Sequence, residues 1–230
     1  MELSAVILAG GESRRMGRDK AWLHFDGKPL MKLAVEKARQ LGIKEVFISG
    51  RAGEDYSALE CPVLFDLEPG FGPIGGIERG LHECRSSLLL VLAVDLPRMS
   101  PTFLGRMCDV CDRLTGAVPK LNGQLEPLAA IYPKRCHAFA FAALTKSQHS
   151  ARDFASACLH ERAVKVCSVT RGETLNFSNW NRPGDLADAG SPALSRITMM
   201  RSTEPMGNPS PTSQSPASDE TGKQPGGDQA

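Results

Sequence analysis

Three features that often identify a protein's partners are scarce or absent in this chain of 230 residues. Its 27 Lys and Arg are balanced by 26 Asp and Glu, so a formal net charge of +1 gives no global attraction to nucleic acid or to an anionic membrane. No apolar run approaches the roughly 20 residues that a membrane-spanning helix needs. The opening MELS leads into an apolar segment without the basic and apolar regions of a secretory signal. We therefore expect a cytoplasmic protein with no nucleic-acid or membrane partner, which recognises charged ligands locally.

Cysteine usage also excludes one class of protein. Seven cysteines, an odd number spread from Cys61 to Cys167, do not form a disulfide framework in a chain of this length and indicate a reducing compartment. Cys108 and Cys111 form one CxxC motif, but no second pair accompanies it and its context, FLGRMCDVCDRL, is helical. Half-buried helix residues are the default interpretation, and a zinc or redox site is the alternative. A convincing Ser-His-Asp or Cys-His set is also missing.

The segment VILAGGESRRMGRDK, which ends at Lys20, has the composition of a phosphate-binding loop. A short apolar run at residues 5–8 predicts a buried strand, and Gly10-Gly11 follows at once. Because these glycines lack a Cβ, the main chain can approach an anion closely and successive N–H groups can surround its oxygens. Arg15 and Lys20 are two of the four cations that follow the glycines. The alternative is a surface turn with a solvated charge run. A P-loop does not fit, because five residues separate the two glycines that would frame it and Arg-Asp follows.

The rest of the chain alternates short apolar strands with helices, which predicts an α/β doubly wound, mostly parallel mixed sheet in one domain, residues 1–190. LLLVLAVD is apolar on both faces, so we place it in the middle of a parallel sheet, and it ends at Asp95. Asn122-Gly123 predicts a tight turn and an antiparallel hairpin. Residues 191–230 are rich in Pro, Ser, Thr, Gly and Gln, which predicts a disordered tail that catalysis does not need. Helices are expected at 29–41, before Cys84, at 101–114, near 137–144, from Ser150 and at 182–189, and strands at 46–49, 63–66, 116–120 and 164–169.

Two acidic residues and a glycine-rich stretch are further candidates. In such sheets ligands bind at the carboxyl ends of the strands, where Gly10, Asp66 and Asp95 are expected. Asp95 ends a strand buried on both faces, and its carboxylate beside a phosphate loop is a candidate Mg²⁺ ligand; a helix N-cap or a loop salt bridge is the alternative. PGFGPIGGI contains a literal GxGxxG, but its glycines do not follow a strand directly and Pro73 lacks the N–H that a pyrophosphate would need. NAD or FAD binding is therefore the less favoured interpretation.

These segments together resemble the molybdenum cofactor guanylyltransferases and their relatives among the nucleotidyltransferases. The resemblance covers about residues 5–189 and rests on LAGGESRRMGRDK with the strand-like AWLHF and DGKPL after it, on PGFGPIGGI, on LNGQLEPLAAIY and on LNFSNWNRPGDL. It implies transfer of GMP from GTP to a terminal phosphate of molybdopterin, with release of pyrophosphate and with Mg²⁺ as cofactor. The catalytic residues that it implies are Arg15, Lys20 and Asp95, with Asp95 as the metal ligand. The implied nucleotide-binding residues are Leu8, Ala9, Gly10, Gly11, Lys20, Ser49, Asp66 and Asp95, and the implied acceptor-binding residues are Gly72, Pro73, Gly75, Glu126, Pro127, Asn179 and Asn181.

Departures from the family pattern affect base and acceptor recognition. In the closing motif Trp180 stands where a small aliphatic residue is usual and Arg182 replaces a threonine, while Ser49-Gly50 stands where some relatives carry an asparagine. The alternatives are a molybdopterin cytidylyltransferase, a sugar or polyol phosphate nucleotidyltransferase, and a nucleotide-binding protein that delivers the cofactor without catalysis. Lys20 and Asp95 favour an enzyme over a carrier. A molybdoenzyme apoprotein or its chaperone is a further expected partner, and the Gly-Gly pair with Asp19-Lys20 favours GTP over CTP.

Overall fold

The computed structural model describes residues 2–9, 20–66 and 70–179, and all structural statements below concern these residues. They lie within the first of two compact units into which the chain divides, Met1–Asp188. The expected domain end near residue 190, the helix at 182–189 and the tail at 191–230 lie outside the described residues and stay predictions. No helix in the described ranges combines the length and the apolar character that crossing a membrane requires.

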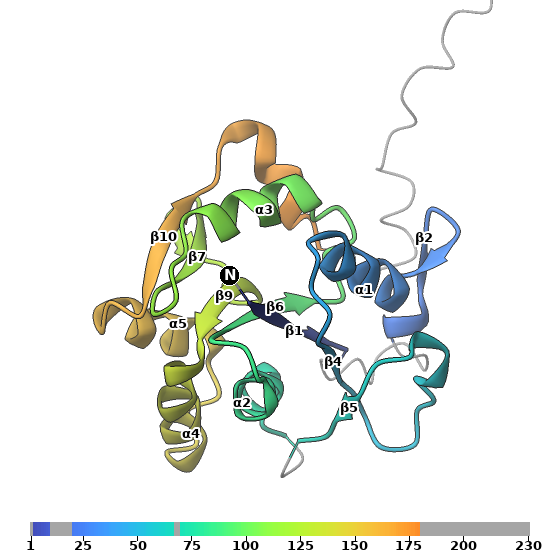
Figure 1. The fold of residues 1–230 in the computed structure, drawn as a ribbon, viewed down its shortest axis with the longest axis horizontal. Coiled ribbons are helices and arrows are strands. Elements are labelled where there is room, and N and C mark those ends of the chain that lie inside the picture. The colour runs from blue at the N-terminus through green and yellow to red at the C-terminus, as the bar shows by residue number, and fades with distance from the viewer. Residues whose placement is uncertain (1, 10–19, 67–69, 180–230) are drawn as a thin grey trace, which may run out of the picture. The chain divides into compact units, whose positions relative to one another are not determined.

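An eight-stranded sheet organises the described residues in the order β10-β7-β9-β6-β1-β4-β5, with β8 paired to β7 (Figure 1). Parallel pairs join β1 to β4 and β6, β4 to β5, and β7 to β10, whereas β9 runs antiparallel to both β6 and β7. This confirms the mixed, mostly parallel sheet. The strands are β1 (Leu3–Leu8), β4 (Val46–Ser49), β5 (Val63–Leu64), β6 (Leu88–Ala93), β7 (Gly116–Leu121), β8 (Gln124–Leu125), β9 (Ala129–Pro133) and β10 (Val164–Ser168).

The central strand β6 corrects one expectation. It is buried at every position, as its apolar sequence predicts, but it has a parallel neighbour on one side only. The reason lies in the hairpin at Asn122-Gly123, where both residues have positive φ, 49° and 84°. The chain turns back there through β8, and β9 then enters the sheet between β6 and β7.

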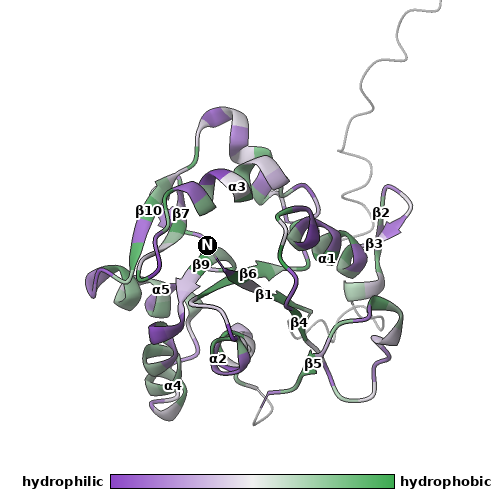
Figure 2. Ribbon diagram, viewed as in Figure 1, coloured by the Kyte–Doolittle hydropathy of each residue, from purple (hydrophilic) through white to green (hydrophobic). Residues whose placement is uncertain are grey.

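Helices cover both faces of the sheet, and the side chains of the strands alternate between them. Ile7 and Leu90 pack in the cluster that contains α1 (Leu30–Gln40) and α3 (Pro101–Asp109). Val6 and Leu89 pack in the cluster that contains α2 (Pro73–Glu83), α4 (His137–Thr145) and α5 (Ala151–His160). Figure 2 shows β1 and β6 as apolar strands in the centre of this arrangement. The expected N-cap Ser150 is confirmed, since its Oγ accepts the Asp153 N–H at 3.2 Å.

Two local expectations are wrong. AWLHF is not one strand, because residues 20–22 form the short helix η1 (Lys20–Trp22), followed by a small hairpin of β2 (His24–Phe25) and β3 (Lys28–Pro29). The Asp26-Gly27 turn between them, with φ of 49° and 76°, is the cause. Helix α3 ends at Asp109 and not near Leu114, because the Asp112 carboxylate accepts the Leu114 N–H at 2.9 Å and turns the chain. Three further short helices are η2 (Ser57–Leu59), η3 (Lys134–Cys136) and η4 (Arg171–Phe177).

Candidate active site

The carboxyl ends of β5, β4, β1 and β6 lie side by side and bring several of the predicted residues to one edge of the sheet. In the strand ladder Leu8 is opposite Ser49 of β4 and Ala93 of β6, and Ser49 is opposite Leu64 of β5. Asp66 follows two residues after Leu64, and Asp95 follows two residues after Ala93. The two carboxylates therefore emerge from strands that are separated only by β4 and β1.

The first turn of α2 packs on this edge because it is built from residues with little or no side chain. Gly72 is the N-cap with φ 60° and ψ −152°, a conformation that is essentially restricted to glycine, and Pro73 occupies the first helical position. A Cβ on Gly75 would lie 2.8 Å from Cγ and Oδ2 of Asp66, closer than real contacts allow. One on Gly76 would overlap Ser49 Oγ. The glycines thus let the helix touch two predicted nucleotide-binding residues directly.

Asp66 is the electrostatically perturbed member of this group. Its side chain is half-buried, and burial raises the pKa of the carboxyl, with a further increase from Glu78 and a partial offset from Arg79. Glu78 is only 3% exposed, and its Oε1 lies 2.7 Å from Nε2 of His137 on α4. Within the described part of the chain, Glu78 Oε2 and Arg79 Nε are buried without a hydrogen-bond partner. Sequence reasoning missed Glu78 and Arg79, because acidic and basic side chains on an amphipathic helix usually face solvent.

Asp95 is half-buried and is not the cap of the following helix. That position belongs to Ser100, whose Oγ accepts the Phe103 N–H at 3.1 Å, so the N-cap alternative for Asp95 is wrong. A single carboxylate fits a Mg²⁺ ion that takes its other ligands from phosphate oxygens and water. In the described ranges no three His, Cys, Asp or Glu side chains gather as a metal site.

Two of the predicted acceptor residues, Glu126 and Pro127, lie on the opposite side of Asp95 from Asp66. Three others, Gly72, Pro73 and Gly75, lie instead at the start of α2 next to Asp66. Glu126 and Pro127 precede β9, and the Leu128 carbonyl accepts the Ala93 N–H at 2.7 Å, which holds this segment at the carboxyl end of β6. Burial raises the pKa of Glu126, and Arg152 acts in the opposite direction. Asn179 is exposed just beyond η4.

Several predicted residues cannot be placed in this geometry. Gly10, Gly11, Arg15 and Asn181 lie outside the described residues, and Lys20 begins η1 but its side chain is not described. Leu8 and Ala9 have buried side chains, and their backbone groups bond within the sheet: the Leu8 carbonyl accepts the Val94 N–H, and the Ala9 N–H donates to the Ser49 carbonyl.

The CxxC motif and the GxGxxG stretch have ordinary structural surroundings. Cys108 lies in α3 and Cys111 just after it, both half-buried, and Cys111 Sγ donates to the Met107 carbonyl at 3.2 Å. Burial raises the pKa of Cys111 to about 12, the opposite of what a reactive or metal-binding thiolate needs. The glycine stretch is separated from β5, which ends at Leu64, unlike the loop of a dinucleotide fingerprint.

The fold is an α/β sheet with Ser49, Asp66 and Asp95 at the carboxyl ends of its strands, the edge at which ligands bind in proteins of this class. Residues 5–163 match the model of the MobA-like NTP transferase domain family. The chain is similar to the probable molybdenum cofactor guanylyltransferase of Opitutus terrae, 36% identical over 186 residues, which cover 80% of this chain and 92% of the relative. It is also similar to the molybdenum cofactor guanylyltransferase of Xanthomonas euvesicatoria pv. vesicatoria, 31% identical over 183 residues, which cover 78% of this chain and 90% of that one.

Solved structures agree with this assignment. Molybdopterin-guanine dinucleotide biosynthesis protein A from Archaeoglobus fulgidus matches with a TM-score of 0.63 and 25% identity, over 80% of this chain and 95% of that one. The fold is shared with 2-C-methyl-D-erythritol 4-phosphate cytidylyltransferase from Thermus thermophilus, with a TM-score of 0.63 and 20% identity over 82% and 97% of the two chains. The chain therefore belongs to the MobA-like NTP transferase family. It is a nucleotidyltransferase of molybdenum cofactor biosynthesis.

Proposed function

We propose that this enzyme transfers GMP from GTP to the terminal phosphate of molybdopterin, releases pyrophosphate and forms the guanine dinucleotide cofactor. The observation that carries the proposal is the order of groups along the carboxyl edge of the sheet. Asp66 and Ser49 lie under the first turn of α2, Asp95 follows the central strand, and Glu126 lies beyond it next to β9. Such an order suits a nucleotide on one side, an acceptor on the other and phosphate chemistry between them. The guanylyltransferase names of the relatives support GTP as the donor.

The reaction needs alignment and charge neutralisation more than proton transfer. An oxygen of the acceptor phosphate attacks the α-phosphorus of GTP, the bond from that phosphorus to the bridging oxygen of the β-phosphate breaks, and pyrophosphate leaves. Since the nucleophile is already an anion, no general base is required. The chain must hold two crowded anionic groups in line and offset their charge, a role that we assign to Arg15, Lys20 and the N–H groups of the glycine loop.

We assign the Mg²⁺ site to Asp95. When bound there, the ion would neutralise charge on the triphosphate. The carboxylate has the right chemistry for a hard cation and stands between the proposed nucleotide and acceptor sides. We further propose that the reaction takes place in the cytoplasm and that the product passes to a molybdoenzyme apoprotein or its chaperone.

Pyrophosphate release tests the reaction class and the donor. The purified chain is mixed with Mg²⁺, molybdopterin and either GTP or CTP. We expect release with GTP at a higher kcat/KM than with CTP. A higher value with CTP would favour the cytidylyltransferase, release only with a sugar or polyol phosphate would favour that acceptor class, and nucleotide binding without release would leave a carrier.

Replacing Asp95 by asparagine tests the metal assignment. Asp95→Asn keeps the shape and a neutral oxygen but removes the charge that binds a hard cation, so turnover should fall on the order of a hundredfold to ten-thousandfold. Thermal unfolding should hardly change. Asp109→Asn, at the exposed end of α3, is the matched control and should behave as wild type. Near wild-type pyrophosphate release by Asp95→Asn at limiting Mg²⁺ would refute this assignment.

A further inference from the structure

A buried lysine in α1, on the opposite face of the sheet from α2, contacts the turn that follows Asp95. Lys37 lies in α1, and only 9% of its surface is exposed. Its Nζ donates to the Leu96 carbonyl at 3.2 Å and to the Pro97 carbonyl at 2.5 Å. These two carbonyls belong to the residues directly after Asp95. The ammonium group thus bonds to the backbone of one turn, 59 and 60 residues away in the sequence.

The same turn is fixed at its other end. The Leu96 carbonyl also accepts the Met99 N–H at 3.1 Å, which closes the turn. The Ser100 N–H donates to Oδ1 of Asn176, a residue of η4 that is 7% exposed, at 2.9 Å. Residues 96–100 are therefore held by α1 on one side and by η4 on the other. Asp95 has little freedom left in its backbone, because both the buried strand before it and the turn after it are anchored.

An ammonium group at this depth is unfavourable for stability. Burial lowers the pKa of Lys37 from 10.5 to about 8, since the charged form is poorly solvated there. An apolar side chain of similar length would fill the same space without that desolvation, which offsets the loss of the hydrogen bonds to the two carbonyls. A lysine that served packing alone would therefore be a poor choice at this position. Directing two backbone carbonyls is a role that an apolar side chain cannot take.

We propose that Lys37 is a positioning residue that sets the place of the Asp95 carboxylate by fixing the turn at residues 96–99. The proposal rests on the proposed function, because it takes Asp95 to be the Mg²⁺ ligand. Lys37 touches neither substrate nor metal and acts through the backbone. Partners that orient a metal ligand without touching the metal typically change metal affinity or activity by about 10- to 100-fold when they are removed.

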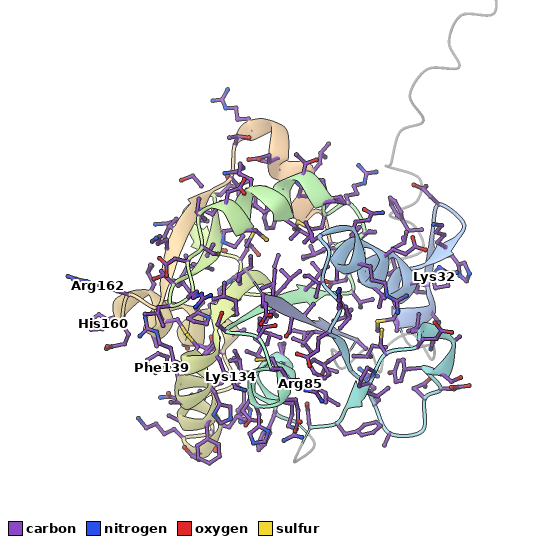
Figure 3. All side chains as sticks on the ribbon, in the orientation of Figure 1. Lys32, Arg85, Lys134, Phe139, His160 and Arg162 are labelled. Carbon is purple, nitrogen blue, oxygen red and sulfur yellow. The ribbon has the colours of Figure 1, made fainter. Side chains whose placement is uncertain are left out.

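The test compares Lys37→Met with Lys32→Met. Methionine keeps the length and the apolar stem of lysine but removes the ammonium group. Lys32 lies on the same helix, is exposed and is labelled in Figure 3, so it controls for the loss of a positive charge from α1. The first measurement needs no ligand: amide hydrogen exchange is followed in a peptide that covers residues 94–100. We expect faster exchange in this peptide for Lys37→Met only, with thermal unfolding at the wild-type temperature or above it.

The second measurement follows the metal directly. Electron paramagnetic resonance reports the affinity of Mn²⁺, used in place of Mg²⁺, in the presence of GTP and without the acceptor. We expect the affinity of Lys37→Met to fall on the order of tenfold or more, while GTP affinity measured without metal stays at the wild-type value. In turnover, the Mg²⁺ concentration for half-maximal rate should rise in the same proportion.

Each outcome decides between the two proposals. If Lys37→Met does not fold, or unfolds well below wild type, Lys37 is a structural residue and this proposal is wrong. Unchanged exchange at residues 94–100 together with unchanged Mn²⁺ affinity would also overturn it. If Asp95→Asn retains full Mg²⁺-dependent release, the proposed metal assignment fails instead, and faster exchange in Lys37→Met would then be a property of the turn alone.

Discussion

Gly75→Ala is the substitution that separates nucleotide recognition from stability most clearly. Gly75 lies in the first turn of α2, and an added Cβ would come within 2.8 Å of Cγ and Oδ2 and 2.9 Å of Oδ1 of Asp66. The atoms in the way are the far end of one side chain, not backbone. The Asp66 carboxylate should therefore move aside while the helix stays in place.

The magnitudes favour a loss of function without a loss of stability. Alanine is preferred over glycine within a helix by about 1 kcal/mol, which offsets much of the cost of displacing a half-buried side chain. We expect the free energy of unfolding to stay within about 1 kcal/mol of wild type in urea titrations. A hydrogen bond from a ligand to a charged group is worth about 1.5–3 kcal/mol, so a displaced Asp66 should raise the Kd and KM for GTP by roughly 10- to 100-fold.

Two controls make this test sharp. Gly105→Ala introduces the same change in α3, where no atom lies within 4 Å of the new Cβ, and it should leave GTP binding unchanged. In an Asp66→Ala background Gly75→Ala should have no further effect on GTP affinity, because both act through the same carboxylate. If Gly75→Ala folds and binds GTP as wild type does, the assignment of Asp66 to the nucleotide is wrong. If the two effects simply add, Gly75→Ala acts on GTP binding by a route other than the Asp66 carboxylate.

Three further measurements follow from the contacts described above. The Lys37 ammonium group holds its proton more tightly in the unfolded chain than in the folded chain. The contribution of Lys37 to the free energy of unfolding should therefore rise between about pH 8 and 10.5 and be lost as the pH falls through 8. This difference of about 3 kcal/mol should appear in urea titrations of wild type relative to Lys37→Met. Glu78→Gln removes a charge that raises the pKa of Asp66, so that pKa should fall in a carboxyl-carbon NMR titration, and no change would show that the two groups do not interact. Arg106 binds Glu173 through Nε at 3.0 Å and a terminal nitrogen at 2.8 Å. A double-mutant cycle of Arg106→Lys with Glu173→Gln should give a coupling of about 0.5–1 kcal/mol in the free energy of unfolding. Zero coupling would show that solvent screens the pair.

The strands and helices of this chain were predictable where a local pattern decides them. LLLVLAVD is buried on both faces, Pro29 and Gly42 bracket α1, and Asn122-Gly123 makes the expected turn. Predictions failed where a single side chain competes with the pattern. The Asp112 carboxylate bonds to the Leu114 N–H, so residues 112–114 form a turn and not the helix that was expected there. Asp26-Gly27 turns a strand-like stretch into a hairpin, although that pair of residues is itself a recognised turn signal.

The candidate site was predictable in part for the same reason. Asp66, Asp95 and Ser49 could be placed because each ends or closely follows an apolar strand, and parallel strands end at one edge. Glu78 and Lys37 could not, because each stands in an amphipathic helix as a surface charge would. Their burial depends on what packs over them, His137 from α4 and the turn after Asp95, which lie 59 or 60 residues away in the sequence.

The antiparallel strand β9 divides the sheet into two halves, each made of parallel strands. On one side of it β6, β1, β4 and β5 run parallel and end in the residues assigned to the nucleotide, and on the other side β7 and β10 form a parallel pair of their own. The junction between the halves is a backbone ladder from Leu88–Pro133 to Leu92–Ala129, which depends little on side-chain identity. If Glu126 and Pro127 bind the acceptor as proposed, changes in the hairpin segment before β9 can alter acceptor recognition without breaking the ladder that joins the two halves.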